Sequence, residues 1–269
     1  MRAFSVSTVA GCIGLNPYED ISDALEAIWS KEDRNGYYTC VNSMRPKESL
    51  AKKRFQLKKA LASDEAKKMK VIQQDTQSST SDKVNNIMSV EKTTLSDEQH
   101  KLLVKHCKSK TSTSHGVRNE ASALSIYADE TDSDVEEYNK VVSATYNDKF
   151  CIRGKVDGIV PNSVNGEFKI VEIKNRARRL FGKVVGYEYC QTQLYLYIND
   201  QQNCDLVECF NGEINIFPIE RDNEYIDLVL RKLAIVDSLI SELKISQDVQ
   251  KEYMKADDKN QYLFSKLEI

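Results

Sequence analysis

Apolar residues recur at helical spacing through the first half of the chain. Residues 20–31 place apolar side chains on one stripe behind an acidic cap, which predicts an amphipathic helix. The same spacing predicts further helices over residues 45–69, 95–108 and 115–128, with Glu120 at the edge of the last apolar stripe. The polar run at 73–83 predicts a loop or a mobile insertion.

The period changes to that of β-strands after residue 140. Strands are expected over residues 141–146, 150–160, 168–174, 204–210 and 213–219, separated by turns that contain Asn, Gly or Pro. Helices are expected at 187–197, which is rich in aromatic residues, and at 222–243. Helices followed by a strand-rich block with a helix inside it predict a single α/β or α+β domain around a mixed sheet, and exclude a pure helical bundle.

Composition narrows the class of protein. The chain has 269 residues, of which 41% are hydrophobic and 29% charged, as in an ordinary folded protein. We expect no membrane contact, because no run approaches the roughly 20 apolar residues that a spanning helix needs. The apolar stretch at 3–15 is interrupted by Ser, Thr and Gly, so we expect it to belong to the fold and not to a secretory signal.

The spacing of the cysteines and histidines argues against a zinc site and against an iron–sulfur cluster. Seven scattered cysteines with no C-x-x-C pair predict free thiols in a reducing intracellular compartment, the cytoplasm or the nucleus. Zinc and iron–sulfur sites usually have short paired spacings, so neither cofactor is expected. The three histidines match no motif of a zinc enzyme.

Charge is distributed unevenly although the net charge is only −3. Residues 44–70 carry ten basic and three acidic side chains, whereas 129–137 contains six carboxylates. Each stretch fits either a solvated face or a functional surface. In the basic stretch, the candidates for contacts with DNA are Lys52, Lys53, Lys58 and Lys59.

The most informative segment is a predicted hairpin formed by residues 154–160 and 167–176, with a turn at 161–166. Period two places Glu172 and Lys174 on one face of the second strand, with Ile173 on the other. Asp157 and Glu172 can therefore share one divalent ion, with Lys174 beside it. An exposed hairpin with an ordinary D…E-x-K alternation remains the alternative.

Oxygen ligands favour Mg²⁺, or Mn²⁺ as a substitute. A neighbouring lysine can orient or help to deprotonate a metal-bound water and can stabilise charge on phosphorus, so the implied chemistry is phosphodiester hydrolysis. Three arginines follow the strand directly and are candidates for contacts with DNA phosphates: Arg176, Arg178 and Arg179.

Six motifs occur in a fixed order: residues 7–18 (STVAGCIGLNPY), 27–31 (AIWSK), 115–127 (HGVRNEASALSIY), 156–158 (VDG), 172–174 (EIK) and 191–195 (QTQLY). This set resembles the PD-(D/E)-x-K nucleases, and among them the lambda-exonuclease-like, YqaJ-type viral recombination exonucleases. The resemblance implies one restriction-endonuclease-like domain over residues 1–269, with a central mixed sheet flanked by helices. It leaves a basic helical insertion at about 45–110 unexplained.

The resemblance also implies roles for individual residues. The implied metal ligands are Asp157, Glu172, the main-chain carbonyl of Ile173 and Glu120. Lys174 would serve the attacking water, Gln191 would lie beside the catalytic core, and Ser7 would receive a 5′-terminal phosphate of DNA. Each of Glu120, Gln191 and Ser7 also fits a plain surface or capping role. Two positions depart from the family pattern: Val156 replaces a frequent proline, and Arg2 is the only arginine near Ser7.

The function implied is a metal-dependent exonuclease that acts on duplex DNA ends, 5′→3′, in recombination, repair or viral genome processing. The alternatives are an endonuclease or single-strand nuclease of the same superfamily, and a catalytically idle protein that binds DNA ends. The resemblance also leaves open a single-strand annealing or single-strand-binding protein as a partner, and a homo-oligomer.

Overall fold

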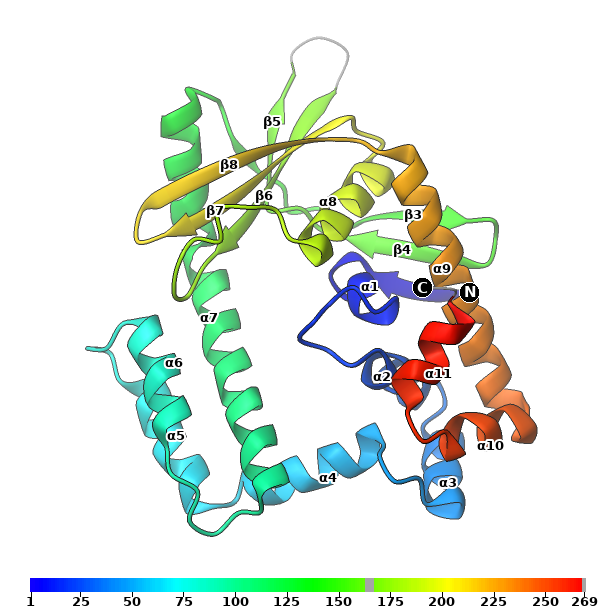
Figure 1. Ribbon diagram of the computed structural model, residues 1–269. Helices are drawn as coiled ribbons and strands as arrows, with labels where there is room; N and C mark the ends of the chain where they lie inside the picture. Colours follow the sequence, from blue (N-terminus) through cyan, green and yellow to red (C-terminus); the bar gives the residue numbers. More distant parts are fainter. Residues whose placement is uncertain (163–166, 268–269) are drawn as a thin grey trace.

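The computed structural model describes residues 1–162 and 167–267, so most of the turn predicted at 161–166 lies outside the described residues. The strands of this part of the chain form two mixed sheets (Figure 1). The smaller has the order β1-β4-β3, with β1 (Arg2–Ser5), β3 (Val142–Tyr146) and β4 (Phe150–Gly154). The larger has the order β2-β5-β6-β7-β8, with β2 (Glu136–Glu137), β5 (Gly158–Pro161), β6 (Phe168–Asn175), β7 (Asn203–Phe210) and β8 (Glu213–Glu220). Together with the helices these sheets confirm the α/β class, although the single central sheet that was expected is divided in two.

The division falls inside the strand predicted at 150–160. Its first part is β4 and its second part is β5, which belong to different sheets, and residues 155–157 connect them. Val156 in this connection is buried in the same core as Ile152 and Ile159, so the apolar pattern continues through the break and conceals it. Asp157 therefore lies immediately before β5 and outside the pairing of β5 with β6.

Helices cover both faces of the larger sheet. On one face, Ile170 and Leu206 share a core with α1 (Val6–Cys12), α2 (Ile21–Glu32), α8 (Gly186–Asn199) and α9 (Asn223–Ile245). On the other face, Val171 and Ile173 pack against Ala123 and Tyr127 of α7 (Asp97–Thr131). Strands β6 and β7 are parallel, and α8 is the helix that connects them. Alternate residues of β6 therefore face α8 and α7.

A helical arm lies beside this core and has a small core of its own. It consists of α4 (Leu50–Ala60), α5 (Asp64–Gln74), α6 (Thr80–Ser89) and the first half of α7, drawn in blue to green in Figure 1. Buried Met69, Ile87 and Leu103 hold it together. The helix expected at 45–69 is therefore wrong as one element, since it divides at Ser63, which caps α5.

Two further boundaries in the arm differ from the expectation. The loop predicted at 73–83 is limited to residues 75–79, because Ser79 accepts a hydrogen bond from the N–H of Asp82 and caps α6. The helices predicted at 95–108 and 115–128 are one helix of 35 residues. The polar residues between them contain no proline, and Thr111 satisfies its hydroxyl by donating to the carbonyl of Cys107.

Helices α3 (Arg34–Met44), α10 (Gln247–Lys255) and α11 (Lys259–Lys266) were not predicted. They meet around the buried carboxylate of Glu26, which accepts hydrogen bonds from the hydroxyls of Tyr37 and Tyr253 and from Lys259 Nζ. In the sequence, Glu26 has the appearance of an exposed helix residue, so the pattern gives no sign of this packing.

Two simpler expectations concern the cysteines and the membrane. All seven cysteines carry free thiols, and all but the half-buried Cys151 are buried. Among the helices of the described ranges, none has both the length and the apolar character that crossing a bilayer requires.

Candidate active site

Three predicted residues meet on the α8 face of β6. Glu172 is only 3% exposed, and its Oε1 accepts hydrogen bonds from Lys174 Nζ at 2.7 Å and from Gln191 Nε2 at 2.9 Å. Lys174 Nζ also donates to Oε1 of Gln191 at 2.9 Å. Each of the three side chains thus contacts the other two. The period of the strand aligns Glu172 with Lys174, and the βα crossover brings Gln191 above them.

Asp157 contacts the main chain of β6 between Glu172 and Lys174. Its Oδ2 accepts a hydrogen bond of 2.8 Å from the N–H of Ile173. The N–H of Arg176 donates to the carbonyl of Cys209 in β7, so the even-numbered residues here direct their main-chain groups toward β7. The carbonyl of Ile173 points the same way as its N–H, toward Asp157, because both groups of one strand residue lie on the same side. β5 pairs with β6 only as far as Val171, so this edge of Ile173 lies beyond the β5 ladder.

Glu120 approaches from α7, on the other face of the sheet. Burial, followed by the charge of Asp157, raises the pKa of Glu120 above its ordinary value. Burial also raises the pKa of Asp157. For Glu172, burial and then the charge of Asp157 raise the pKa to about 8, despite the opposing effect of Lys174. The nearby charges of Lys174 and Lys155 only partly offset these effects on Glu120 and Asp157, so the three carboxylates favour additional positive charge.

One buried atom indicates where a cation fits. Oε2 of Glu172 is buried without a hydrogen-bond partner. Such atoms are rare in folded proteins, and a cation would both satisfy this oxygen and reduce the repulsion among the carboxylates. Within residues 1–162 and 167–267, no three His, Cys, Asp or Glu side chains are grouped closely enough to hold an ion. Asp157, Glu172 and the main-chain carbonyl of Ile173 could together hold such an ion, since oxygen donors with waters completing the shell suit Mg²⁺.

Arg176 lies elsewhere than the sequence suggested. It is 8% exposed and donates to both oxygens of Glu188, at 2.6 and 2.9 Å, and to Oε1 of Glu208 at 2.9 Å. Both carboxylates are buried. Arg176 is therefore a structural residue and is removed from the candidates for DNA contact. Arg178 and Arg179 are exposed two and three residues further on, and for them the prediction stands.

The four lysines of α4 are not equivalent. Lys53 Nζ forms ion pairs with Asp20 and Asp23, at 2.9 and 2.8 Å, and Lys52 Nζ donates to main-chain carbonyls of residues 46 and 47. Lys53 is thus neutralised by two carboxylates, whereas Lys52 is exposed and contacts only neutral carbonyls. Lys58 and Lys59 are exposed, and Lys59 Nζ lies 4.5 Å from the ring centroid of Phe55. For the exposed Lys52, Lys58 and Lys59 the prediction of contacts with DNA stands, and Lys53 is the one of the four that is paired with carboxylates.

Ser7 is exposed in the first turn of α1, and its Oγ lies 3.0 Å from Oγ of Ser5. Arg2 is not available to it, because its guanidinium forms ion pairs with Glu32 and Asp237 and thereby connects β1 to α2 and α9. Among the described residues, no hydrogen bond joins Ser7 to a basic side chain. The role of Ser7 at a 5′ phosphate stays a prediction.

Sequence reasoning missed several neighbours of the site. Tyr195 Oη accepts a hydrogen bond of 3.3 Å from Gln191 Nε2, and the i,i+4 spacing on a helix could have identified it. No sequence signal marks Glu188 and Glu208, because they reach Arg176 only through the tertiary fold.

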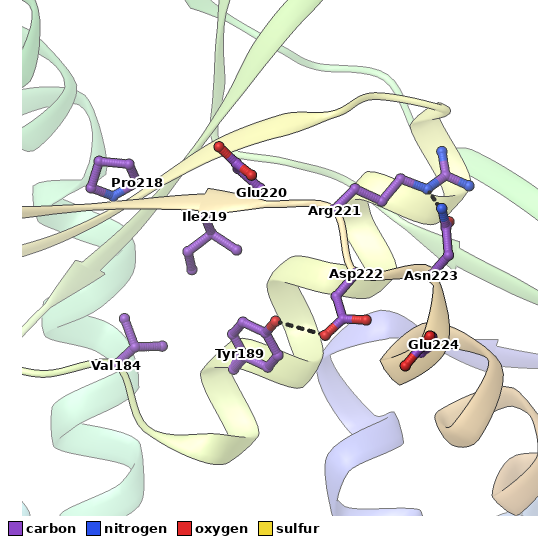
Figure 2. A pocket seen from close by; sticks show the side chains of 9 residues that line it. All are labelled: Val184, Tyr189, Pro218, Ile219, Glu220, Arg221, Asp222, Asn223 and Glu224. Atoms are coloured by element: carbon purple, nitrogen blue, oxygen red, sulfur yellow. Dashed lines mark hydrogen bonds between the residues drawn. The ribbon is translucent and has the colours of Figure 1, made fainter.

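A separate hollow lies where β8 meets α9 (Figure 2). It is lined by Tyr189, Asp222 and neighbouring residues, and Tyr189 Oη lies 3.5 Å from Oδ2 of Asp222. Tyr189 and Gln191 are two positions apart on α8, so their side chains point to nearly opposite sides of that helix. The hollow is therefore distinct from the carboxylate site.

Comparison with known proteins gave one family match. Residues 50–202 match the family described as the YqaJ-like viral recombinase domain. The matched range contains Glu120, Asp157, Glu172, Lys174 and Gln191 and excludes the segment around residue 7. No curated protein matches the chain.

Three solved structures show a distant similarity. The alkaline exonuclease from Laribacter hongkongensis is 20% identical, with 56% of this chain and 86% of that chain covered and a TM-score of 0.40. Its complex with dAMP is also 20% identical, with coverage of 68% and 89% and a TM-score of 0.40. A phage-related exonuclease from Haemophilus somnus is 16% identical, with coverage of 49% and 73% and a TM-score of 0.37.

Proposed function

The chain belongs to the YqaJ-like viral recombinase domain family, and from this premise we propose that it is a metal-dependent exonuclease that hydrolyses phosphodiester bonds from the ends of duplex DNA. The observation that carries the proposal is the group formed by Glu172, Lys174 and Gln191, with a buried carboxylate oxygen that has no hydrogen-bond partner. The setting we propose is recombination, repair or viral genome processing.

The ligands that we propose for Mg²⁺, with Mn²⁺ as a substitute, are Asp157, Glu172 and the carbonyl of Ile173, with Glu120 near them. When bound, the ion would polarise the scissile phosphate and lower the pKa of an attacking water. Burial is the largest single effect and lowers the pKa of Lys174, but the charge and hydrogen bond of Glu172, together with the charges of Glu188 and Asp157, raise that pKa on balance, so the side chain is an ammonium. As an ammonium, Lys174 can orient a water and stabilise negative charge on the phosphate.

Gln191 acts on this chemistry through orientation. Its amide oxygen accepts from Lys174 while its amide nitrogen donates to Glu172, which fixes both side chains in one geometry. A glutamate at this position could not donate to Glu172 and would add a fourth carboxylate. The amide thus keeps Lys174 and Glu172 in place without changing the charge of the site.

The proposed polarity is 5′→3′, and the proposed partner is a double-stranded DNA end. Both follow from the resemblance of the ordered motifs and from the family. Self-association and a single-strand annealing or single-strand-binding partner belong to the same set of expectations.

The test uses linear and covalently closed circular duplexes, each with Mg²⁺ or with EDTA. We expect digestion of the linear duplex only, with Mg²⁺ only. Asp157→Asn, Glu172→Gln and Lys174→Met should each reduce the rate by several orders of magnitude. The thermal unfolding midpoint should stay at or above that of the parent for Asp157→Asn and Glu172→Gln, which remove a repelling charge, and should fall for Lys174→Met, which leaves Glu172 buried without its ammonium partner. Glu224→Gln, an exposed carboxylate in the hollow of Figure 2, is the matched control and should be fully active.

The other outcomes identify the alternatives. Cleavage of the circle would indicate an endonuclease, and binding of DNA ends without hydrolysis would indicate a catalytically idle protein. If the three site variants digested DNA at the parental rate, the proposed active site would be refuted.

A further inference from the structure

An exposed aromatic ring lies close to the proposed active site. Tyr18 is 64% exposed, and its ring packs edge-on against Tyr187, with a centroid distance of 6.0 Å and an interplanar angle of 80°. The loop that carries Tyr18 is held in place, because its N–H donates to Oδ1 of Asn16 and the N–H of Leu15 donates to the carbonyl of Ala10. A large ring is thus kept at the surface on a fixed support.

The support connects this ring to the reacting groups. Tyr187 and Gln191 are four residues apart on α8, so they lie on the same face of the helix, about 6 Å apart along its axis. Gln191 contacts both Glu172 and Lys174. Tyr18 is therefore connected to the reacting groups through Tyr187 and one turn of α8, over two steps of about 6 Å each.

A second exposed ring packs against Arg176. Phe181 is 38% exposed, and the Arg176 guanidinium carbon lies 3.9 Å from its ring centroid. The N–H of Phe181 donates to Oε1 of Glu208 at 2.7 Å, which fixes its loop to β7. Arg176 lies on the same face of β6 as Lys174 and binds Glu188, the residue after Tyr187. The buried ion cluster therefore connects Phe181 to α8 at the residue next to Tyr187.

We propose that Tyr18, Tyr187 and Phe181 form a shelf on which unpaired nucleobases of the strand entering the site are stacked. Aromatic rings interleaved with basic residues bind single-stranded nucleic acid in this way, because every base presents a π-face. The exposed Arg178 and Arg179 lie on the loop between Arg176 and Phe181 and are placed to contact the phosphates of the same strand. The shelf rests on the proposed function and adds to it which chemical group of the substrate the protein holds: the bases at the end of the strand.

The test detects stacking directly. A short duplex carries 2-aminopurine at the first or second nucleotide of its 5′ end, and its fluorescence is measured with the full-length protein in EDTA, where we expect binding without hydrolysis. Stacking on an aromatic ring quenches this fluorophore. We expect quenching by the parent and by Tyr18→Phe, and loss of quenching with Tyr18→Leu, which keeps apolar volume but has no π-face.

The kinetic expectation is a rise in KM of roughly five- to a hundred-fold for Tyr18→Leu, with a smaller change in kcat, since stacking on one residue contributes to binding of the strand by about that factor. Phe181→Leu is the second variant and should act in the same direction. Because Tyr18 is mostly exposed, Tyr18→Leu should unfold at the parental temperature.

The failure of the shelf and the failure of the proposed function give different results. If the protein binds duplex ends and Tyr18→Leu and Phe181→Leu quench 2-aminopurine as the parent does, the shelf is wrong and the exonuclease proposal stands. If neither the parent nor any variant binds or digests DNA ends, both the proposed function and the shelf are wrong.

Discussion

Replacement of Arg176 by methionine should destabilise the protein strongly, because it breaks a buried ion cluster on one side only. Glu188 is 2% exposed and receives both of its side-chain hydrogen bonds of 2.6 and 2.9 Å from Arg176. Glu208 is also buried but keeps donors from the N–H groups of Phe181 and Gly182 and from Asn215. The uncompensated charge is therefore concentrated on Glu188.

Removal of one partner from a buried pair typically costs about 3–5 kcal/mol. In a chain of this size each kcal/mol lowers the unfolding midpoint by roughly 2–4 °C, so Arg176→Met should unfold about 6–20 °C below the parent.

The assay is urea or thermal unfolding, followed by DNA binding in EDTA. Arg178→Met is the matched control, since it removes an exposed arginine from the same loop and should change stability by no more than about 0.5 kcal/mol. It should instead weaken DNA binding. The reasoning is refuted if Arg176→Met unfolds within a degree of the parent and loses DNA affinity, because Arg176 would then be the phosphate contact.

Three further predictions follow from other parts of the molecule. Replacement of Lys58 and Lys59 by glutamine should reduce the slope of log K against log[salt] for DNA binding by about 1.8, at roughly 0.9 for each lost phosphate contact; an unchanged slope would indicate a solvated face. Ser7→Ala should narrow the difference in digestion rate between 5′-phosphate and 5′-hydroxyl ends, and equal rates for the parent on both ends would contradict a phosphate pocket. Hydrogen bonds, first from the N–H of Thr94, lower the pKa of Glu65, so this group stabilises the arm above the usual carboxyl pKa. The difference in unfolding free energy between the parent and Glu65→Gln should therefore be fully present at pH 7 and should decrease below about pH 4, as measured by urea unfolding.

The elements that a sequence pattern can predict are those whose burial has a regular period. The strands near 141–146, 168–174, 204–210 and 213–219 and the helices near 20–31, 187–197 and 222–243 occur within about two residues of their expected ends. The pattern fails where a buried apolar residue continues through a break, as Val156 does between the two sheets. It also fails where a buried polar group organises the packing, as Glu26 does for the helices at the C-terminus.

The candidate site follows the same rule. Glu172 and Lys174 are two positions apart on a strand, so their common face is fixed by local geometry. The contact of Gln191 with both, and of Asp157 with the N–H of Ile173, depends on a crossover and on a strand break that the sequence does not mark. Arg176 shows the limit most clearly, because its buried partners are 12 and 32 residues away in the chain.

The single helix α7 contributes residues to two separate cores and connects them without a break. Leu103 is anchored among the helices of the arm and Glu120 approaches the carboxylates of β6, about 26 Å further along one uninterrupted helix. A continuous helix keeps its two ends in a fixed relative orientation, whereas a loop between them would let them move independently. One continuous helix therefore fixes the orientation of the arm relative to Glu120, while Ala123 and Tyr127 hold the following turns against β6. The carbonyl of Gly116 accepts a hydrogen bond from the side chain of Asn175 at the end of β6, so α7 is also attached to the sheet one turn before Glu120.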